Sequence, residues 1–204
     1  EMLQLLSSSE RSVDIDVYIA SGLKAATDYF LRVRAYDLAQ SQLFLEDLAR
    51  TRIGRFSNAA ASLVGLTKSR LYITPEKSAE LNEQLNATPY TGQATRFAIV
   101  IPVKKDVCWW AMREEERLRE IEIHTRKSMP YLASVKRELY HSTGIDDLDF
   151  ITYFETADLK AFHELAVALS GIRENDFHSR WGQPTLLGTI QSIPDAVARL
   201  CRQP

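Results

Sequence analysis

The chain has 204 residues, of which 45% are hydrophobic, so it can bury a packed core in one large domain or two small ones. Its 25 Lys and Arg residues against 27 Asp and Glu residues leave a formal net charge of −2. This balance provides no excess positive field for a nucleic-acid backbone or an anionic membrane surface, and no apolar run approaches the roughly twenty residues that cross a bilayer. Neither nucleic acid nor a membrane is therefore predicted as a partner.

The start of the chain and its cysteines exclude further classes of protein. Because the chain begins at Glu1 and no basic-then-apolar leader follows, we expect a processed or truncated product. The two cysteines, Cys108 and Cys201, are too few and too far apart for a disulfide framework or a zinc site. We expect them to be inert thiols.

The first elements expected along the chain are the remnant of a helix and a hairpin. Residues 1–12 are polar with scattered leucines, as in the end of a helix. Residues 13–23 and 27–35 alternate and carry β-branched or aromatic side chains, with Gly22 near the turn between them. This pattern predicts two antiparallel strands.

A helix is expected after the hairpin. Asp37 is a suitable N-cap for a helix over residues 38–50, with Leu43 and Leu48 on its buried side. Residues 57–66 are predicted as a further strand, although alanines weaken the pattern. The polar stretch that follows, residues 74–93, is rich in Pro and Gly breakers and is predicted to be a linker with one short helical piece.

The second half has clearer periodicity. Residues 96–105 (RFAIVIPVKK) predict a buried strand, and Asp106 is expected to cap a long helix through REEERLREIEIHTRKS. The STGIDD turn joins two alternating segments into a predicted hairpin. The remaining expected elements are strands at 134–141 and 148–155, a helix at 158–169, an extended segment at 172–190 and a closing helix at 193–202.

This order of elements predicts the fold class. Strand, helix, strand, strand, helix, strand is the order of a ferredoxin-like unit, an antiparallel sheet with helices on one face. The first half shows the same order without its first strand. We therefore expect an α+β fold of the dimeric α+β barrel type, with two tandem ferredoxin-like subdomains at residues 1–90 and 91–204.

Common catalytic motifs are absent from the sequence. It has no GxG for a dinucleotide or phosphate loop, no GxSxG for a hydrolase and no CxxCH for a covalently attached haem. The four histidines include no pair spaced for a shared metal on one helix face. One side of the predicted long helix carries Trp110, Leu118, Ile121, His124 and Ser128, so His124 is expected to face inward. For a single histidine judged in isolation, a buried ring satisfied by a hydrogen bond is the more common explanation, and spacing alone does not choose His124 over the other histidines.

Arg137 is the more unusual position. It shares a strand face with Val135 and Leu139, and an unpaired guanidinium on an apolar face is strongly disfavoured, so it requires an anionic partner. A structural pair with Asp149 or Glu155 is one explanation, and a site for an anionic ligand is the other. The charge run between residues 113 and 122 is predicted to be a solvated helix face with i,i+4 pairs.

Three segments carry a resemblance to a known family. AIVIPVKKDVCWW, HTRKSMPYLASVKRELYHSTGIDDLDFITYFET and RWGQPTLLGTI resemble the long-chain, oligomeric branch of the chlorite dismutases. The likeness runs from about Val13 to Pro204 and is strongest from Arg96 to Ile190. The family usually has a further strand and helix start before the position of Glu1, so we expect an incomplete N-terminal subdomain.

The resemblance implies a non-covalent haem b, one per subunit, between the helix and the sheet of the C-terminal subdomain. It implies that His124 is the proximal iron ligand, that Glu174 and Lys105 form its proximal network, and that Arg137 is the distal catalytic residue. Further haem contacts implied by the family motifs are Tyr72, Ile73, Trp109, Trp181, Leu139, Thr152 and Phe154.

The implied activity is decomposition of chlorite to chloride and dioxygen, through ferryl iron and transient hypochlorite. The resemblance also implies a homo-oligomer, expected to be a pentamer, and a periplasmic location, with a cytoplasmic one as the alternative. A coprohaem decarboxylase shares the fold and proximal histidine but generally lacks an arginine at the position of Arg137. The remaining alternative is a non-catalytic haem-binding protein or interaction module, since fold alone does not fix function.

Overall fold

The computed structural model describes residues 1–7, 13–67 and 75–201. The α-helices are α1 (Met2–Ser7), α2 (Leu38–Arg50), α3 (Pro75–Ala87), α4 (Val107–Ala111), α5 (Glu114–Ser128), α6 (Leu159–Ser170) and α7 (Ile193–Leu200). Short 3-10 helices are η1 (Gly54–Phe56), η2 (Met129–Tyr131) and η3 (Arg173–Phe177). The strands are β1 (Val13–Ile19), β2 (Tyr29–Ala35), β3 (Leu66–Thr67), β4 (Phe97–Lys105), β5 (Val135–His141), β6 (Phe150–Thr156), β7 (His178–Trp181) and β8 (Leu186–Gln191). Within these ranges, no helix combines the length and the apolar character needed to span a bilayer.

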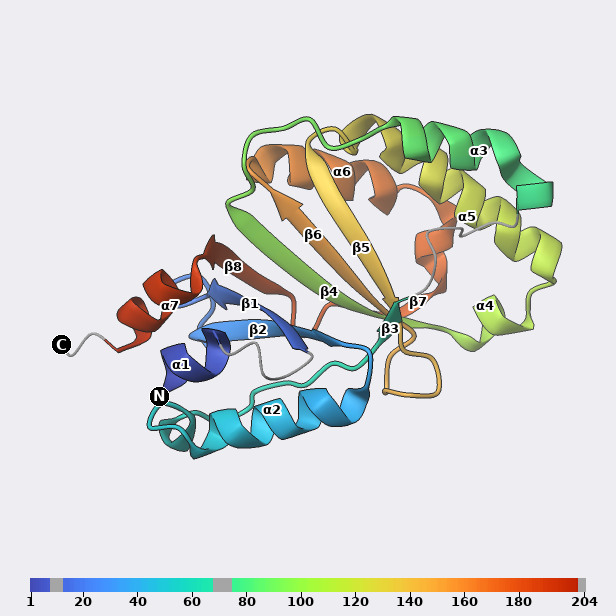
Figure 1. Cartoon of the computed structure of the whole chain (residues 1–204). Helices are drawn as coiled ribbons and strands as arrows, with labels where there is room; N and C mark the ends of the chain where they lie inside the picture. The colour runs from blue at the N-terminus through green and yellow to red at the C-terminus, as the bar shows by residue number, and fades with distance from the viewer. Residues whose placement is uncertain (8–12, 68–74, 202–204) are drawn as a thin grey trace. The chain divides into compact units, whose positions relative to one another are not determined.

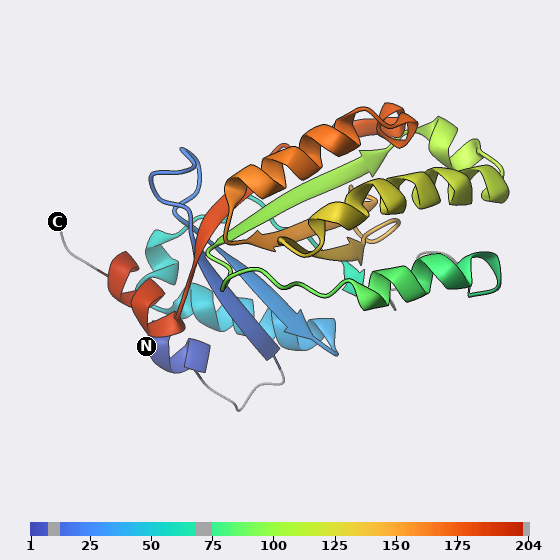
Figure 2. The same ribbon diagram turned by 90° about the horizontal axis from the view of Figure 1, so that it is seen from above.

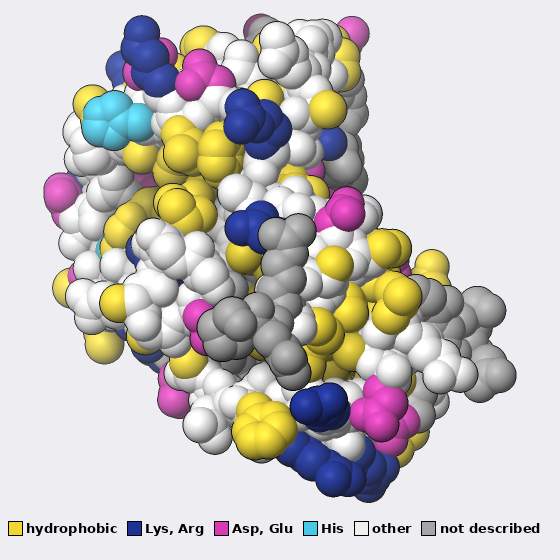
Figure 3. Space-filling view, turned by 90° about the vertical axis from the view of Figure 1, so that its left-hand side faces the viewer, with side chains coloured by type: hydrophobic (Ala, Val, Ile, Leu, Met, Phe, Trp, Pro, Cys, Tyr) yellow, Lys and Arg dark blue, Asp and Glu magenta, His cyan; other side chains and the backbone are white. Residues whose placement is uncertain are grey.

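The elements form two compact units, residues 1–62 with 187–204 and residues 63–186. These bounds differ from the predicted subdomains 1–90 and 91–204, because α7 packs with α1 and β1, and β3 pairs with β5. The assignment of 1–90 and 91–204 as the two subdomains stays a prediction. On the face drawn in Figure 3, Lys and Arg side chains lie next to Asp and Glu side chains, in keeping with the near balance of charges.

The first unit is an antiparallel sheet in the order β2-β1-β8, with helices packed on one face. The hairpin and the helix over residues 38–50 are confirmed, and Asp37 accepts a hydrogen bond from the backbone of Ala39 at 2.9 Å. The buried residues of α2 are Phe44 and Leu48, whereas Leu43 is 48% exposed, so its predicted burial is wrong. The core also contains Met2, Leu6, Val17, Ile19 and Ala196.

The second unit has the ferredoxin-like arrangement. Its antiparallel sheet has the order β7-β4-β6-β5, with the short β3 beyond β5. Helices α5 and α6 cover one face of this sheet in Figures 1 and 2. The rings of Phe154 on β6 and Phe162 on α6 lie 5.1 Å apart, which fixes α6 on that face. The predicted α+β class is confirmed.

Two segments between α2 and β4 differ from their predictions. Residues 57–66 do not form a strand, since only Leu66 and Thr67 pair with β5, and the alanines offer little side chain to pack on a sheet. Residues 74–93, predicted as a linker with one short helical piece, contain the 13-residue helix α3, so a helix is present but is longer than predicted. Its sequence starts with Pro75, which suits a first helical position, and continues with good helix formers. Leu81 is buried and anchors the helix.

The predicted long helix after Asp106 is two helices. Asp106 caps only the short α4, accepting a hydrogen bond from the backbone of Trp109 at 2.9 Å. Met112 and Arg113 are extended, and α5 begins at Glu114 with three acidic residues in its first turn. Carboxylates are stabilised at a helix N-terminus by the helix dipole, so this charge run favours a new start.

Strand β7 contains a register shift. Trp181 pairs with Val103 and Arg180 pairs with Lys104. The next residue of β4, Lys105, pairs with His178 and not with Ser179. Ser179 is therefore an extra residue, and its hydroxyl contacts the carbonyl oxygens of Lys104 and Lys105 at 3.3 and 3.2 Å. A bulge of this kind changes which face the following side chains occupy.

Candidate functional site

His124 on α5 lies beside Glu174 on η3. Its Nδ1 is 3.0 Å from Oε2 of Glu174, and the carboxylate is almost fully buried. The imidazole is partly exposed, and within the described part of the chain its Nε2 makes no hydrogen bond. A neutral ring that donates Nδ1–H to the carboxylate keeps the lone pair of Nε2 for a ligand.

Lys105, at the end of β4, binds Oε1 of Glu174, the carboxylate oxygen that does not contact His124. Its Nζ forms an ion pair with Oε1 of Glu174 and lies 3.4 Å from the backbone oxygen of the same residue. The ammonium also lies 4.1 Å from the ring centroid of Trp109, a favourable cation–π position. The backbone N–H of Lys105 donates to Asp149 at 2.8 Å. The lysine is therefore fixed at both its backbone and its side chain.

The charges in this cluster are coupled. Burial favours the neutral acid and would raise the pKa of Glu174, but the hydrogen bond with His124 and the positive charge of Lys105 outweigh it. The pKa of Glu174 is consequently held well below its usual range. Burial lowers the pKa of Lys105, and the charge of Glu174 partly offsets that effect. The carboxylate is thus kept ionised and able to accept from His124.

His178 at the start of β7 completes the cluster. Its Nε2 lies 2.8 Å from Nζ of Lys105 and 3.1 Å from Oε1 of Glu174. Its ring stacks on Trp181 with the centroids 5.3 Å apart, and its side chain is 7% exposed. We did not predict this residue as part of the site, because strand alternation does not reveal the bulge at Ser179 that sets it beside Lys105.

Arg137 on β5 reaches α5. Its Nη1 donates to the hydroxyl of Ser128 at 2.8 Å, and Ser128 lies one turn of α5 beyond His124. The guanidinium therefore contacts the same helix that carries His124. Of the carboxylates considered as structural partners, Asp149 accepts from the backbone of Lys105. Glu155 is opposite Lys136 in the strand register and so lies on the other face of the sheet.

The predicted lining residues share the face of Arg137. Arg137 pairs with Phe154, and Leu139 with Thr152, so the four side chains point to one side of the sheet. Phe154 is buried, while Leu139 and Thr152 are half-buried. The hydroxyl of Thr152 donates to the backbone of Ile101 at 2.8 Å. These residues form a mostly apolar wall around the guanidinium.

The other predicted haem contacts divide into three cases. Trp109 is buried against Lys105 and Phe177, with the aromatic rings 5.8 Å apart. Trp181 is 42% exposed and stacks on His178. Tyr72 and Ile73 lie outside the described residues.

The donor set can be tested against an iron porphyrin. Such a group needs one axial imidazole with a free nitrogen, a carboxylate or carbonyl on the other ring nitrogen, and an apolar wall. His124 and Glu174 supply the first two, and the face carrying Leu139 and Phe154 supplies the third. The residues present fit the group.

Comparison with known proteins decides the family. A family model described as chlorite dismutase matches residues 1–190. The chlorite dismutase of Ideonella dechloratans is 50% identical over 200 residues, which are 98% of this chain and 70% of that protein. The chain belongs to the chlorite dismutase family.

Solved structures of the family agree in fold. The chlorite dismutase of Candidatus Nitrospira defluvii in complex with imidazole superimposes with a TM-score of 0.89 at 38% identity, over 97% of this chain and 82% of that chain. A mutant of the same enzyme gives a TM-score of 0.89 at 36% identity, over 97% and 83% of the two chains. These chlorite dismutases have the ferredoxin-like α+β fold predicted from the order of elements.

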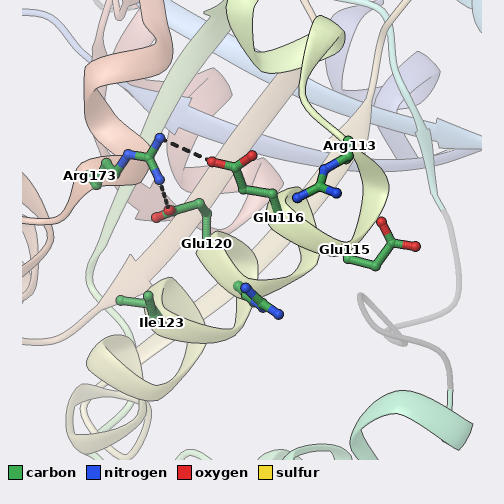
Figure 4. A pocket seen from close by; sticks show the side chains of 7 residues that line it. Arg113, Glu115, Glu116, Glu120, Ile123 and Arg173 are labelled. Carbon is green, nitrogen blue, oxygen red and sulfur yellow. Dashed lines mark hydrogen bonds and ion pairs between the residues drawn. The ribbon is translucent and has the colours of Figure 1, made fainter.

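A hollow beside α5 and η3 is drawn in Figure 4. It has a volume of about 540 Å³ and is lined by Arg113, Glu115, Glu116, Arg119, Glu120, Ile123 and Arg173. Arg173 bonds Glu120 at 2.9 Å and Glu116 at 3.2 Å, and so ties η3 to α5. Glu120 is buried, so the predicted solvated face is wrong at this residue. The tie holds Glu174, the next residue in the chain, beside His124.

Proposed function

We propose that this protein is a haem b-dependent chlorite dismutase that decomposes chlorite into chloride and dioxygen. One observation carries the proposal: the hydrogen-bonded series Lys105, Glu174, His124 leaves a single imidazole nitrogen available for iron. The relative of 50% identity, itself a chlorite dismutase, supports the substrate. The guanidinium of Arg137 on β5 supports an anionic substrate.

The residues on the α5 side set the character of the iron ligand. His124 would bind the iron through Nε2 and donate Nδ1–H to Glu174. A carboxylate that accepts this hydrogen makes the imidazole a stronger electron donor. Lys105 keeps Glu174 ionised and oriented, so the donor strength of His124 is fixed by a buried ion pair. When bound, the haem iron would supply the redox chemistry that breaks the Cl–O bonds of chlorite and forms the O–O bond of dioxygen.

Arg137 acts on the substrate side. Its guanidinium would hold the chlorite anion and then retain the hypochlorite anion during turnover, through charge-assisted hydrogen bonds. The hydroxyl of Ser128 accepts one guanidinium N–H and holds the side chain in place. The wall of Leu139, Thr152 and Phe154 limits water around the charge, which strengthens the interaction with an anion.

The proposal is tested by adding haem b to the protein, recording its absorption spectrum and following dioxygen release after mixing with chlorite. His124→Ala is expected to abolish stable haem binding, and His163→Ala, an exposed histidine on α6, is the matched control. Absence of dioxygen from the haem-loaded wild type would overturn the proposal. Peroxide-driven loss of propionates from coprohaem would indicate a coprohaem decarboxylase in its place.

Arg137→Gln is expected to slow dioxygen release by about 10²-fold, because a positioned positive charge is lost, and to let hypochlorite escape into solution. A hypochlorite-trapping dye measures the escape. Lys136→Gln removes a cation from the adjacent position on the other face of β5 and is expected to change neither readout. Equal activity of wild type and Arg137→Gln would remove Arg137 from the mechanism.

We also propose that the protein works as a periplasmic homo-oligomer, a pentamer with one haem per subunit. The support is the resemblance to the long-chain branch of the family. Light scattering on the purified protein should give a mass of roughly five chains, and a monomer would contradict this part of the proposal.

A further inference from the structure

His178 is the one member of the buried cluster to which the proposed mechanism gives no role. Its Nε2 is closer to Nζ of Lys105, at 2.8 Å, than to Oε1 of Glu174, at 3.1 Å. Both distances are within hydrogen-bonding range, but a single ring nitrogen carries either one hydrogen or one lone pair. It therefore serves one of these two neighbours.

The chemistry of the two neighbours decides which. A hydrogen on Nε2 could be donated to Oε1 of Glu174, but the ammonium of Lys105, which has only donors, would then lie 2.8 Å from an N–H group with nothing to accept its hydrogen. With its lone pair at Nε2, the ring instead accepts a hydrogen bond from Lys105. The charge of the ammonium is required by Glu174, a buried carboxylate whose ion pair with Lys105 offsets its desolvation.

The surroundings of Lys105 show what the imidazole adds. The ammonium has three hydrogens, and its neighbours on three sides are Oε1 of Glu174, the backbone oxygen of Glu174 at 3.4 Å and Nε2 of His178. The Trp109 ring also lies against the ammonium, with its centroid 4.1 Å from Nζ. With His178 in place, the number of acceptor atoms near Nζ equals the number of ammonium hydrogens, which favours one orientation of the side chain.

We propose that His178 is a positioning residue: its neutral ring, protonated at Nδ1, accepts from Lys105 and thereby orients Glu174 so that Oε2 faces His124. The effect on iron rests on the function proposed above, whereas the tautomer of His178 does not. Stacking on Trp181 holds the plane of the ring and so aims its lone pair at Lys105.

The first test reads the tautomer directly, on the full chain without added haem. Long-range proton–nitrogen NMR correlations of the imidazole rings distinguish Nδ1-protonated from Nε2-protonated histidines. We expect His178 to be neutral and protonated at Nδ1. Protonation of His178 at Nε2, or at both nitrogens at neutral pH, would overturn the proposal. This result does not depend on haem binding.

The second test uses two variants of the haem-loaded protein. His178→Phe keeps a ring against Trp181 but removes the acceptor, and His178→Gln places an amide oxygen near the position of Nε2. We expect the iron–histidine stretching band of the ferrous protein, measured by resonance Raman, to broaden or split in His178→Phe, because Glu174 takes more than one orientation. His178→Gln should restore a single band.

The control is His163→Phe, the same chemical change at an exposed position of α6, which should leave the band unchanged. A wild-type band in His178→Phe would overturn the positioning role. If the wild type shows no iron–histidine band at all, the proposed haem ligation fails, and the NMR result still decides the tautomer of His178.

Discussion

Two of the charge networks among the described residues differ sharply in burial. In the second unit, Lys105 and Glu174 have side chains that are 3% and 9% exposed. In the first unit, Arg34 and Asp14 on the hairpin are 33% and 69% exposed, and Asp16 joins them through contacts with Arg32 at 2.7 Å and Arg34 at 3.3 Å. Both networks contain two or more hydrogen-bonded ions.

The difference shows where charge is retained for a purpose other than stability. An exposed pair costs little to desolvate and contributes little. A buried pair costs much to desolvate and often stabilises no more than a hydrophobic pair of the same volume. The Lys105–Glu174 pair is therefore better explained by what it does to His124 than by what it does to folding.

The largest effect is expected for Lys105→Met. It leaves the carboxylate of Glu174 buried without its cation, so the free energy of unfolding should fall by about 3–5 kcal/mol. Urea unfolding followed by circular dichroism measures the change. The double variant Lys105→Met/Glu174→Leu removes both charges and should be less destabilised than the single variant. If the double variant has the lower free energy of unfolding, the unpaired charge of Glu174 is not the cause of the destabilisation.

An intermediate effect is expected for Arg173→Ala. Glu120 is buried and one of its oxygens already has no hydrogen bond within the described residues, so loss of Arg173 removes the bond to the other oxygen. The urea midpoint should fall less than in Lys105→Met. Haem affinity should also fall, because η3 loses its tie to α5 beside Glu174. An unchanged affinity would separate this tie from the ligand cluster.

The smallest effect is expected for Asp14→Asn in the exposed network. The free energy of unfolding should change by at most about 1 kcal/mol, and the change should shrink further in high salt because exposed charges are screened. Urea unfolding at low and high ionic strength measures both. A change as large as that of Lys105→Met would mean that burial does not separate the two networks.

Much of the fold could be predicted from local signals. The alternating or apolar runs at β4, β5 and β6 and the cap Asp37 depend on neighbours in sequence, and each is confirmed. The break between α4 and α5 was missed, because the acidic run was interpreted as the surface of one helix and not as the start of a second. The length of helix α3 was underestimated, because two prolines and a glycine outweighed its helix-forming interior.

The site could be predicted only in part. Family motifs named His124, Glu174, Lys105 and Arg137, and the structure brings the first three into contact. Periodicity alone placed Arg137 on the face of Leu139 and Phe154. Neither approach indicated His178, since its place depends on pairing between strands distant in sequence.

The extra residue in β7 has a consequence for how this scaffold can vary. If β7 paired regularly with β4 while keeping Ser179, Ser179 would stand opposite Lys105 and residue 178 would turn to the opposite side of the sheet, because side chains alternate strictly along a regular strand. Lys105 would then meet a different neighbour without any change in the chemistry of its own strand. Gain or loss of this bulge, and not replacement of one side chain by another, is thus the shortest route by which members of this lineage could exchange the group that the ammonium meets.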